Sequence, residues 1–280
     1  MILHGDALPL LSDLDADSAQ LIVTSPPYAD ARVRTYGGIH PDDYVEWFLP
    51  YGEAMKRVLK PDGTLIINIK EKCVQGERHP YVLELILALR QQGWRWTEEF
   101  IWHKKNSTPG KWPNRFRDAW ERCLQFNLDK KFYMDQEAVM VPVGDWAEAR
   151  LTRKNGLHPN DQKVHHSSVN SGFKKNIANW IGRDLVYPTN VLHLPTECRN
   201  KDHSAAFPEA LPEWFIKLFS KEGDLVIDPF VGSGTTGVVA KQLGREFVGI
   251  EIDEPTVTRA RARIAETPLS VKVDSKSLLH

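Results

Sequence analysis

The chain has 280 residues, of which 41% are hydrophobic and 26% are charged. This is a globular composition, and the length suits one α/β domain with an insertion or a small second lobe. No apolar run reaches the roughly 18 residues of a membrane span, and the N-terminus lacks the pattern of a signal peptide. Cys73, Cys123 and Cys198 form no metal-ligand or disulfide pattern. We therefore expect a cytoplasmic protein without a metal site.

Positive charge is concentrated in the middle of the chain. The formal net charge is −1, but residues 101–199 carry a balance of +6 and the remainder a balance of −7. Chance clustering on a solvated surface would give the same pattern. The positive charge of residues 101–199 therefore indicates a function only in combination with the motifs on either side of it.

The first hundred residues alternate between strand and helix patterns. In chain order, the pattern predicts a strand over 20–24, a helix over 43–59, a turn at Pro61-Asp62-Gly63, a strand over 64–69, a helix over 81–91 and a strand over 99–103. Residues 106–200 then lose this periodicity, and Pro, Gly, Asn, Ser and basic residues dominate. Such a stretch is too long for a plain loop and predicts a small lobe or a functional insertion.

The strand and helix pattern returns near the C-terminus. It predicts a helix over 212–220, a strand over 224–228, a helix over 235–243, a strand over 246–252 and a helix over 255–266. Short apolar strands separated by amphipathic helices indicate an α/β fold, with a mostly parallel sheet and helices on both faces.

A strand runs into a glycine-rich turn at residues 225–236, which read LVIDPFVGSGTT. Gly232 and Gly234 permit positive φ angles and close approach of a ligand, at the strand end where α/β sheets bind ligands. No Lys follows the glycines, which excludes a Walker loop. The spacing of Gly232, Gly234 and Gly237 formally fits GxGxxG, so nicotinamide cofactor binding stays open.

Glu251 ends the following strand, 17 positions after Gly234. A carboxylate there can accept hydrogen bonds from ribose hydroxyls, in nicotinamide and S-adenosylmethionine enzymes alike. Asp228 favours the methyl donor, because a carboxylate beside the loop can meet the positively charged amino-acid end of S-adenosylmethionine. A structural turn followed by a surface acid is the alternative.

The Ser25-Pro26-Pro27-Tyr28 turn follows the strand over 20–24. Two prolines fix φ and remove two backbone donors, so nearby carbonyls are free to point at a ligand. If the Ser25 hydroxyl and a carbonyl of Ser25 or Pro26 accept the hydrogens of an exocyclic amine, its lone pair can turn towards a methyl sulfonium. Tyr28 can stack on a base held out of the duplex. Taken alone, the tetrapeptide is more often an ordinary turn.

These motifs together resemble the amino-methylating DNA methyltransferases of bacterial restriction–modification systems. In the β group of that family, the catalytic motif precedes the target-recognition region and the cofactor motif follows it, which is the order here. The resemblance implies a Rossmann-like, circularly permuted methyltransferase fold. It assigns a catalytic part to 1–105, a target-recognition region to 106–200, a cofactor-binding part to 201–270 and a tail to 271–280.

The motifs and the resemblance predict S-adenosylmethionine as cofactor. By resemblance, Asp6 contacts the adenine amino group and the segment 203–211 encloses the methionine moiety. The predicted cofactor-binding residues are Asp6, His203, Phe207, Asp228, Pro229, Phe230, Gly232, Ser233, Gly234, Thr235, Thr236, Glu251 and Asp253, and the predicted catalytic residues are Ser25, Pro26, Pro27 and Tyr28.

Ser25 is similar to the cytosine-N4 branch of the family, and adenine N6 stays an alternative target. Cytosine-C5 methylation needs a cysteine nucleophile, usually after proline, and none of the three cysteines follows one. The expected partners are double-stranded DNA and a companion restriction endonuclease acting on the same site. Two other functions stay open, a nicotinamide-dependent oxidoreductase and a catalytically silent DNA-binding module.

Basic residues of the middle region and of the loop after Tyr28 are the predicted DNA contacts, although each alone is more often a solvated side chain. They are Arg32, Arg34, Lys104, Lys105, Lys111, Arg115, Arg117, Lys174 and Lys175.

Overall fold

The structure is a computed structural model that describes residues 1–31, 33, 37–106, 110, 113–142, 184–196 and 207–269. The chain divides into two compact units. Residues 1–135 and 190–280 form the larger unit, and residues 136–189 form the smaller one.

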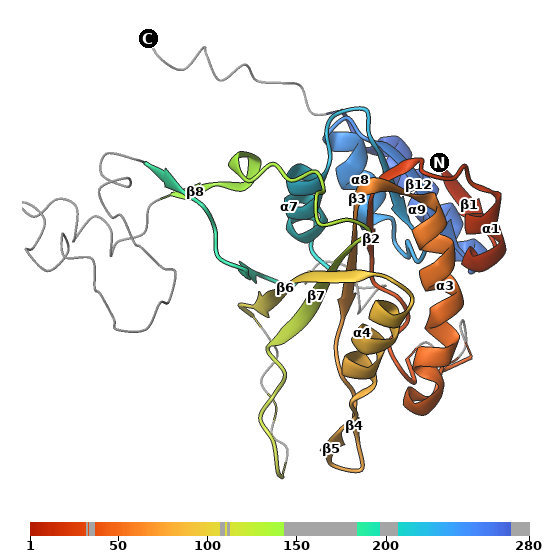
Figure 1. Cartoon of the computed structure of the whole chain (residues 1–280), viewed down its shortest axis with the longest axis vertical. Helices are drawn as coiled ribbons and strands as arrows, with labels where there is room; N and C mark the ends of the chain where they lie inside the picture. The colour runs from red at the N-terminus through yellow and green to blue at the C-terminus, as the bar shows by residue number, and fades with distance from the viewer. Residues whose placement is uncertain are drawn as a thin grey trace, which may run out of the picture. The chain divides into compact units, whose positions relative to one another are not determined.

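A sheet of eight described strands forms the centre of the larger unit (Figure 1). The strand order is β1-β12-β11-β2-β3-β7-β6-β10, and every pairing is parallel except the two that β7 makes with β3 and β6. The strands are β1 (Ile2–His4), β2 (Ala19–Thr24), β3 (Leu59–Ile69), β6 (Arg95–Lys104), β7 (Trp120–Asn127), β10 (Val191–Leu194), β11 (Leu225–Asp228) and β12 (Glu246–Glu251).

Helices cover the sheet in two groups (Figure 1). The first group is α1 (Ala7–Asp13), α3 (Tyr44–Val58) and α4 (Tyr81–Gln91), and the second is α7 (Ala210–Phe219), α8 (Thr235–Gln242) and α9 (Glu254–Glu266). Alternate residues of β3 face different sides of the sheet, and Leu65, Ile67 and Ile69 pack in one cluster with the apolar stripes of α3 and α4. The expected α/β architecture with helices on both faces is therefore confirmed.

The structure differs from the sequence pattern at two places in this sheet. Pro61-Asp62-Gly63 lies inside β3 rather than in a turn, where the pairing of β2 with β3 changes register between Ala19 and Leu21. An irregularity in the ladder thus accommodates the proline. The range 106–200 also contributes two strands to the sheet, β7 and β10, which its composition did not predict.

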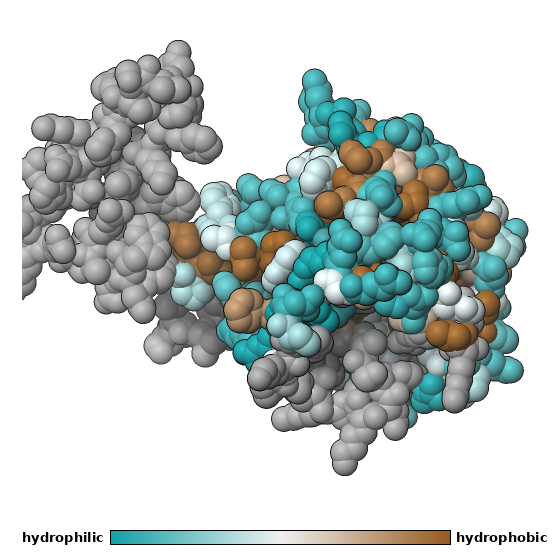
Figure 2. Space-filling model, turned by 90° about the horizontal axis from the view of Figure 1, so that it is seen from below, coloured by the Kyte–Doolittle hydropathy of each residue, from teal (hydrophilic) through white to brown (hydrophobic). Residues whose placement is uncertain are grey.

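Short hairpins extend from this framework. Strands β4 (Cys73–Val74) and β5 (Glu77–Arg78) pair directly after β3, while β8 (Val141–Pro142) and β9 (Leu185–Val186) pair within the smaller unit. Two 3₁₀ turns complete the described elements, η1 (Pro41–Asp43) and η2 (Glu137–Val139). Seen from below, the described surface is mainly hydrophilic, with apolar residues in separate patches (Figure 2). None of the described helices is long and apolar enough to cross a membrane.

Candidate active site

The Ser-Pro-Pro-Tyr turn begins where β2 ends, at the carboxyl edge of the parallel strands. Pro26 and Pro27 are buried and Ser25 is half-buried. The buried Tyr44 hydroxyl donates a hydrogen bond to the Pro27 carbonyl at 2.9 Å. Among the described residues, no side chain or turn amide donates to the carbonyls of Ser25 or Pro26. One or the other of these two carbonyls is predicted from the sequence to accept a hydrogen of the target amine.

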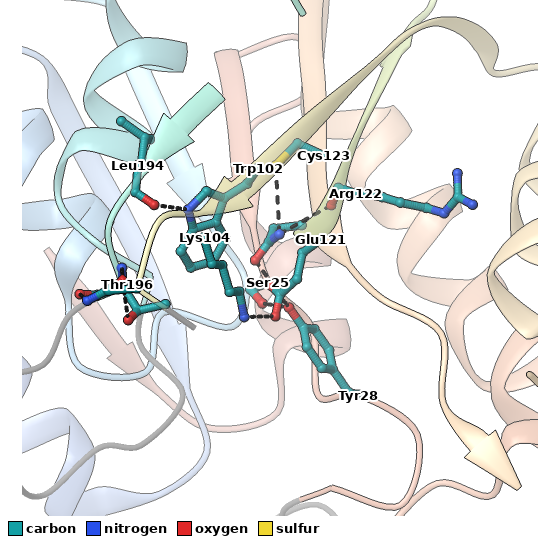
Figure 3. Close-up of polar contacts among 11 residues, drawn as sticks. Ser25, Tyr28, Trp102, Lys104, Glu121, Arg122, Cys123, Leu194 and Thr196 are labelled. Atoms are coloured by element: carbon teal, nitrogen blue, oxygen red, sulfur yellow. Dashed lines mark hydrogen bonds and ion pairs between the residues drawn. The ribbon is translucent and has the colours of Figure 1, made fainter. Parts of the chain in front are cut away.

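The Tyr28 hydroxyl is surrounded by polar groups from strands β3 and β7 and from its own turn (Figure 3). It lies 2.8 Å from Oε2 of Glu121, 3.2 Å from Oδ1 of Asn68 and 3.4 Å from the Ser25 hydroxyl. A phenol has one hydrogen to donate, and the shorter distance favours Glu121 as its acceptor. Burial and the nearby Glu121 carboxylate raise the pKa of Tyr28 well above its ordinary value, so it stays a neutral donor.

Glu121 was not among the predicted site residues, and it connects the catalytic turn to β6. Its carboxylate is 5% exposed and accepts from Lys104 at 2.5 Å through the oxygen that does not meet Tyr28. Lys104 was predicted to grip a DNA phosphate, but its ammonium is paired here with Glu121 and lies over the ring of Trp102. Figure 3 shows Glu121 and Lys104 converging on the Tyr28 hydroxyl, with Arg122 pointing the other way.

A buried hydrogen bond joins the catalytic turn to the glycine-rich turn. The Thr24 hydroxyl, in the last position of β2, donates to Oδ1 of Asp228 at 2.7 Å, and Asp228 ends the neighbouring strand β11. The Thr236 hydroxyl donates to the other oxygen at 2.7 Å, and the Phe230 amide donates to Oδ1 at 3.1 Å. The two turns therefore start from adjacent strand ends and share one anchor.

Asp228 is only 1% exposed, and both of its oxygens accept these hydrogen bonds. Its geometry supports shaping of the turn, rather than the expected direct meeting with the amino group of a methyl donor. Burial raises the pKa of Asp228 to about 6, although the three hydrogen bonds oppose that shift.

The glycine-rich turn leads into α8 with a left-handed backbone at two positions. Gly232 has φ +50° and Gly234 has φ +83°. A Cβ on Gly232 would lie 4.0 Å from the Phe230 carbonyl oxygen, an ordinary van der Waals distance, so this position is not crowded. A Cβ on Gly234 would lie 3.1 Å from the Cβ of Ala260, so this glycine also lets α9 pack closely. Gly237 has a packing role, because its Cβ would lie 2.4 Å from Ile264.

Glu251 turns its carboxylate back onto the glycine-rich turn. Its Oε2 accepts from the Gly232 amide and its Oε1 from the amides of Ile252 and Asp253, each at 3.0 Å. The side chain is 2% exposed. Asp253 caps α9 by accepting from the Thr256 amide at 3.0 Å, a structural role that explains an acid at this position. Glu251 thus holds the turn in shape from the end of β12.

Asp6 lies exposed beyond β1, whose His4 pairs with Glu251. Its Oδ1 caps α1 by accepting from the Leu8 amide at 2.9 Å and lies 3.4 Å from the Tyr51 hydroxyl. Burial, followed by the Asp6 charge, raises the pKa of Tyr51 to about 12. The Tyr51 ring packs against Phe230, with centroids 5.3 Å apart. The structure thus brings Asp6, Phe230 and Glu251 to one edge of the sheet.

The remaining predicted residues have mixed positions. Pro229, Thr235 and Thr236 are buried, and Ser233 and Phe207 are half-buried. Arg115 pairs with Asp118 at 3.4 Å, and Lys105 and Arg117 are exposed. The predicted contacts that lie outside the described residues are Arg32, Arg34, Lys111, Lys174, Lys175 and His203. Among the described residues, no three His, Cys, Asp or Glu side chains are grouped to hold a metal ion.

Comparison with known proteins agrees with this geometry. The sequence model of a family described as DNA methylase matches residues 19–262. The chain belongs to this DNA methylase family. The match spans the catalytic turn, the range 106–200 and the glycine-rich turn, and it therefore covers both halves of the site.

This methylase is similar over nearly its whole length to characterised proteins. The type II methyltransferase M.PvuII of Proteus hauseri is 27% identical to it, over 95% of this chain and 84% of that protein. A solved structure of the PvuII DNA methyltransferase, described as cytosine-N4-specific, superposes with a TM-score of 0.70 at 25% identity, covering 94% and 85% of the two chains. The M1.HpyAVI structure in complex with S-adenosylmethionine shares the fold, with a TM-score of 0.57 at 20% identity over 94% and 98%.

Proposed function

We propose that this methylase transfers a methyl group from S-adenosylmethionine to the N4 amine of a cytosine in double-stranded DNA. The observation that carries the proposal is the hydrogen bond between Thr24 and Asp228. It fixes the amine-accepting turn and the glycine-rich turn on adjacent strands of one sheet edge. Methyl transfer is a direct displacement that depends mainly on such positioning.

The residues at the glycine-rich turn fit S-adenosylmethionine. The turn is not crowded at Gly232, the Gly232 amide donates to Glu251, and the exposed Asp6 carboxylate lies beyond the neighbouring strand. Backbone amides suit a carboxylate, and acidic side chains suit amino and hydroxyl groups. When bound, the cofactor supplies a methyl group on a positively charged sulfur.

The catalytic turn supplies the acceptors for the target amine. A carbonyl of Ser25 or Pro26 and the Ser25 hydroxyl oxygen accept the two amine hydrogens, which directs the nitrogen lone pair towards the methyl group. The same groups stabilise the positive charge that develops on nitrogen, and the proton that the methylated amine then loses passes to solvent water. Tyr28 offers its ring face to the base while its hydroxyl is fixed by Glu121.

Cytosine is preferred to adenine on two grounds. Ser25 is similar to the first residue of the N4 branch, and the PvuII enzyme described as cytosine-N4-specific covers most of the chain. We also propose, from the chain order of the motifs, that the protein belongs to the β group and that residues 106–200 form its target-recognition region. The name of M.PvuII as a type II enzyme supports a restriction–modification role, with a companion endonuclease and action on cytoplasmic DNA.

Methyl transfer from labelled S-adenosylmethionine to mixed genomic DNA tests the proposal. Wild-type protein should label DNA. Ser25→Ala and Tyr28→Ala should lose this activity while binding S-adenosylhomocysteine as the wild type does in calorimetry. Full turnover by either variant would show that the amine site is wrong. Binding of NAD instead would favour the oxidoreductase, and DNA binding without transfer would favour a silent binding module.

A further inference from the structure

The segment 113–119 lies at the same edge of the sheet as the catalytic turn. It leads into β7, which runs antiparallel to β3, so that Ile69 near the end of β3 pairs with Arg122 near the start of β7. The parallel strands β2 and β3 end at this edge. Two residues beyond the segment, Glu121 contacts the Tyr28 hydroxyl at 2.8 Å. The segment is therefore tied closely to the position of the catalytic tyrosine.

Phe116 stands almost fully in solvent at the centre of this segment. Its exposed fraction is 93%, the highest of any large hydrophobic side chain among the described residues. A single exposed apolar residue is common and needs no explanation by itself. Its position at the catalytic edge and the way its segment is supported are what make it informative.

The β4–β5 hairpin supports the segment from the side. Arg78 forms an ion pair with Asp118 at 2.5 Å, and the Asn114 amide lies 3.4 Å from the Gly76 carbonyl. Figure 1 shows the hairpin and the segment before β7 projecting in the same direction. These contacts hold the two sides of Phe116, yet they leave its ring uncovered. The ring is thus presented by an anchored segment and not by an unsupported loop.

Charge around Phe116 suits a polyanion. Arg115 and Arg117 flank it in sequence, and Arg78 joins them through the shared carboxylate of Asp118. Three guanidinium groups thus lie at this segment, two of them sharing the Asp118 carboxylate, and guanidinium groups are suited to contact DNA phosphates. An apolar ring between cations is the pattern with which proteins insert a side chain between base pairs.

We infer that Phe116 inserts into the DNA stack at the place left by the base that rotates into the active site. This inference rests on the proposed function, because an enzyme that modifies an exocyclic amine must take the base out of the duplex. Extrusion leaves an unstacked gap, and an aromatic ring that fills it restores part of the stacking. Phe116 therefore favours the extruded state without touching the reacting atoms.

The recognition site is first mapped by sequencing DNA that the wild-type protein has methylated. The variants are then compared on two duplexes that contain this site. In one duplex the target base is paired, and in the other it is mispaired and easier to extrude. Phe116→Ala should lose ~10- to 100-fold in kcat/KM on the paired duplex, the range expected for a lost base–aromatic stack. On the mispaired duplex the loss should shrink to a few-fold. Phe116→Trp should stay near wild type on both.

Three further measurements complete the test. Leu87→Ala, which truncates a 56% exposed apolar residue on α4, should have the same kcat/KM as the wild type on both duplexes. The affinity of Phe116→Ala for S-adenosylhomocysteine should be unchanged. With 2-aminopurine at the target position, wild-type protein should raise fluorescence more than Phe116→Ala does.

Two results would overturn the inference. Equal losses by Phe116→Ala on both duplexes would indicate general docking, and unchanged activity on the paired duplex would indicate that no insertion occurs. A wild-type protein that methylates no DNA would instead overturn the proposed function itself.

Discussion

At the scale of single residues, the ring and the hydroxyl of Tyr28 have separable roles. Tyr28→Phe keeps the ring but removes the contacts with Glu121, Asn68 and Ser25. A hydrogen bond to a charged group contributes about 1.5–3 kcal/mol, so we expect a loss of at least ~10-fold in kcat. Single-turnover kinetics at saturating DNA and S-adenosylmethionine measure it. A Tyr28→Phe rate as low as that of Tyr28→Ala would contradict a separate role for the ring.

The ion pair of Glu121 with Lys104 is expected to act on catalysis through Tyr28. Glu121→Gln keeps an acceptor for the phenol but loses the charge, whereas Glu121→Ala loses both. We expect kcat to fall by about threefold in the first and at least ~10-fold in the second, with an unchanged KM for S-adenosylmethionine. Lys104→Met should lower kcat in a wild-type background and have little further effect in Glu121→Ala. Additive losses would show that the pair is not coupled to the site.

The sequence motifs predicted the two turns of this site but not the side chains around the Tyr28 hydroxyl, and the reason is physical. The turns at Ser25 and Asp228 carry local signatures, because proline and glycine restrict or free the backbone within a few positions. Glu121 has no such signature. It lies 93 residues after Tyr28 in a stretch without periodicity, and only the pairing of β3 with β7 brings the two together. Lys104 was assigned to phosphate because a charge alone does not reveal its partner.

At the scale of elements, the turn before α8 needs glycine for two reasons that can be separated. Gly234 and Gly223 share φ +83°, but a Cβ would meet Ala260 at 3.1 Å only at Gly234, and it would meet nothing within 4 Å at Gly223. Both alanine variants should lose about 1–2 kcal/mol of unfolding free energy from backbone strain. Gly234→Ala should lose more and also bind S-adenosylhomocysteine more weakly. Equal affinities of the two variants in calorimetry would contradict a role of this turn in cofactor binding.

Asp228 makes the stability of the β11–α8 junction depend on pH. Burial raises its pKa from 3.8 to about 6, so the folded state keeps the proton to higher pH than the unfolded state does. The contribution of this group to the unfolding free energy therefore falls as pH rises from about 4 to above 6. The full fall is on the order of 3 kcal/mol.

Replacing Asp228 with asparagine should remove that pH-dependent part. Urea unfolding at about pH 4.5 and pH 7.5 should show that wild type loses more stability over this interval than Asp228→Asn does. Asp13→Asn, which changes an exposed carboxylate, controls for the general loss of an acid. Parallel pH profiles of wild type and Asp228→Asn would contradict the raised pKa.

Most of the elements followed from local periodicity. The helices α3 and α4 lie within a residue of the predicted bounds, because their apolar stripes recur at helical spacing. The strand β7 was missed, since it reads WERCLQFN and places charged and polar side chains among apolar ones. Some of those polar groups are satisfied only by distant partners, such as Arg122 by Glu71 and Glu99. Long-range pairing of this kind leaves no mark on the local sequence.

At the scale of the whole molecule, the two ends of the chain build one sheet. Strand β2 near the N-terminus lies between β3 and β11, and β1 pairs with β12. The catalytic turn and the cofactor turn are therefore adjacent although Thr24 and Asp228 are 204 positions apart. The residues between these two turns supply, among other elements, β7, β10 and the smaller unit. The predicted role of 106–200 in target recognition remains a prediction.

The base that this methylase modifies, proposed to be cytosine at its N4 amine, can be identified directly. Unmethylated DNA is incubated with the protein and S-adenosylmethionine, digested to nucleosides and analysed by mass spectrometry, with Ser25→Ala as the matched control. We predict N4-methyldeoxycytidine in the wild-type digest and none in that of the variant. N6-methyldeoxyadenosine in its place would contradict the choice of base, and the absence of any methylated nucleoside would contradict the function itself.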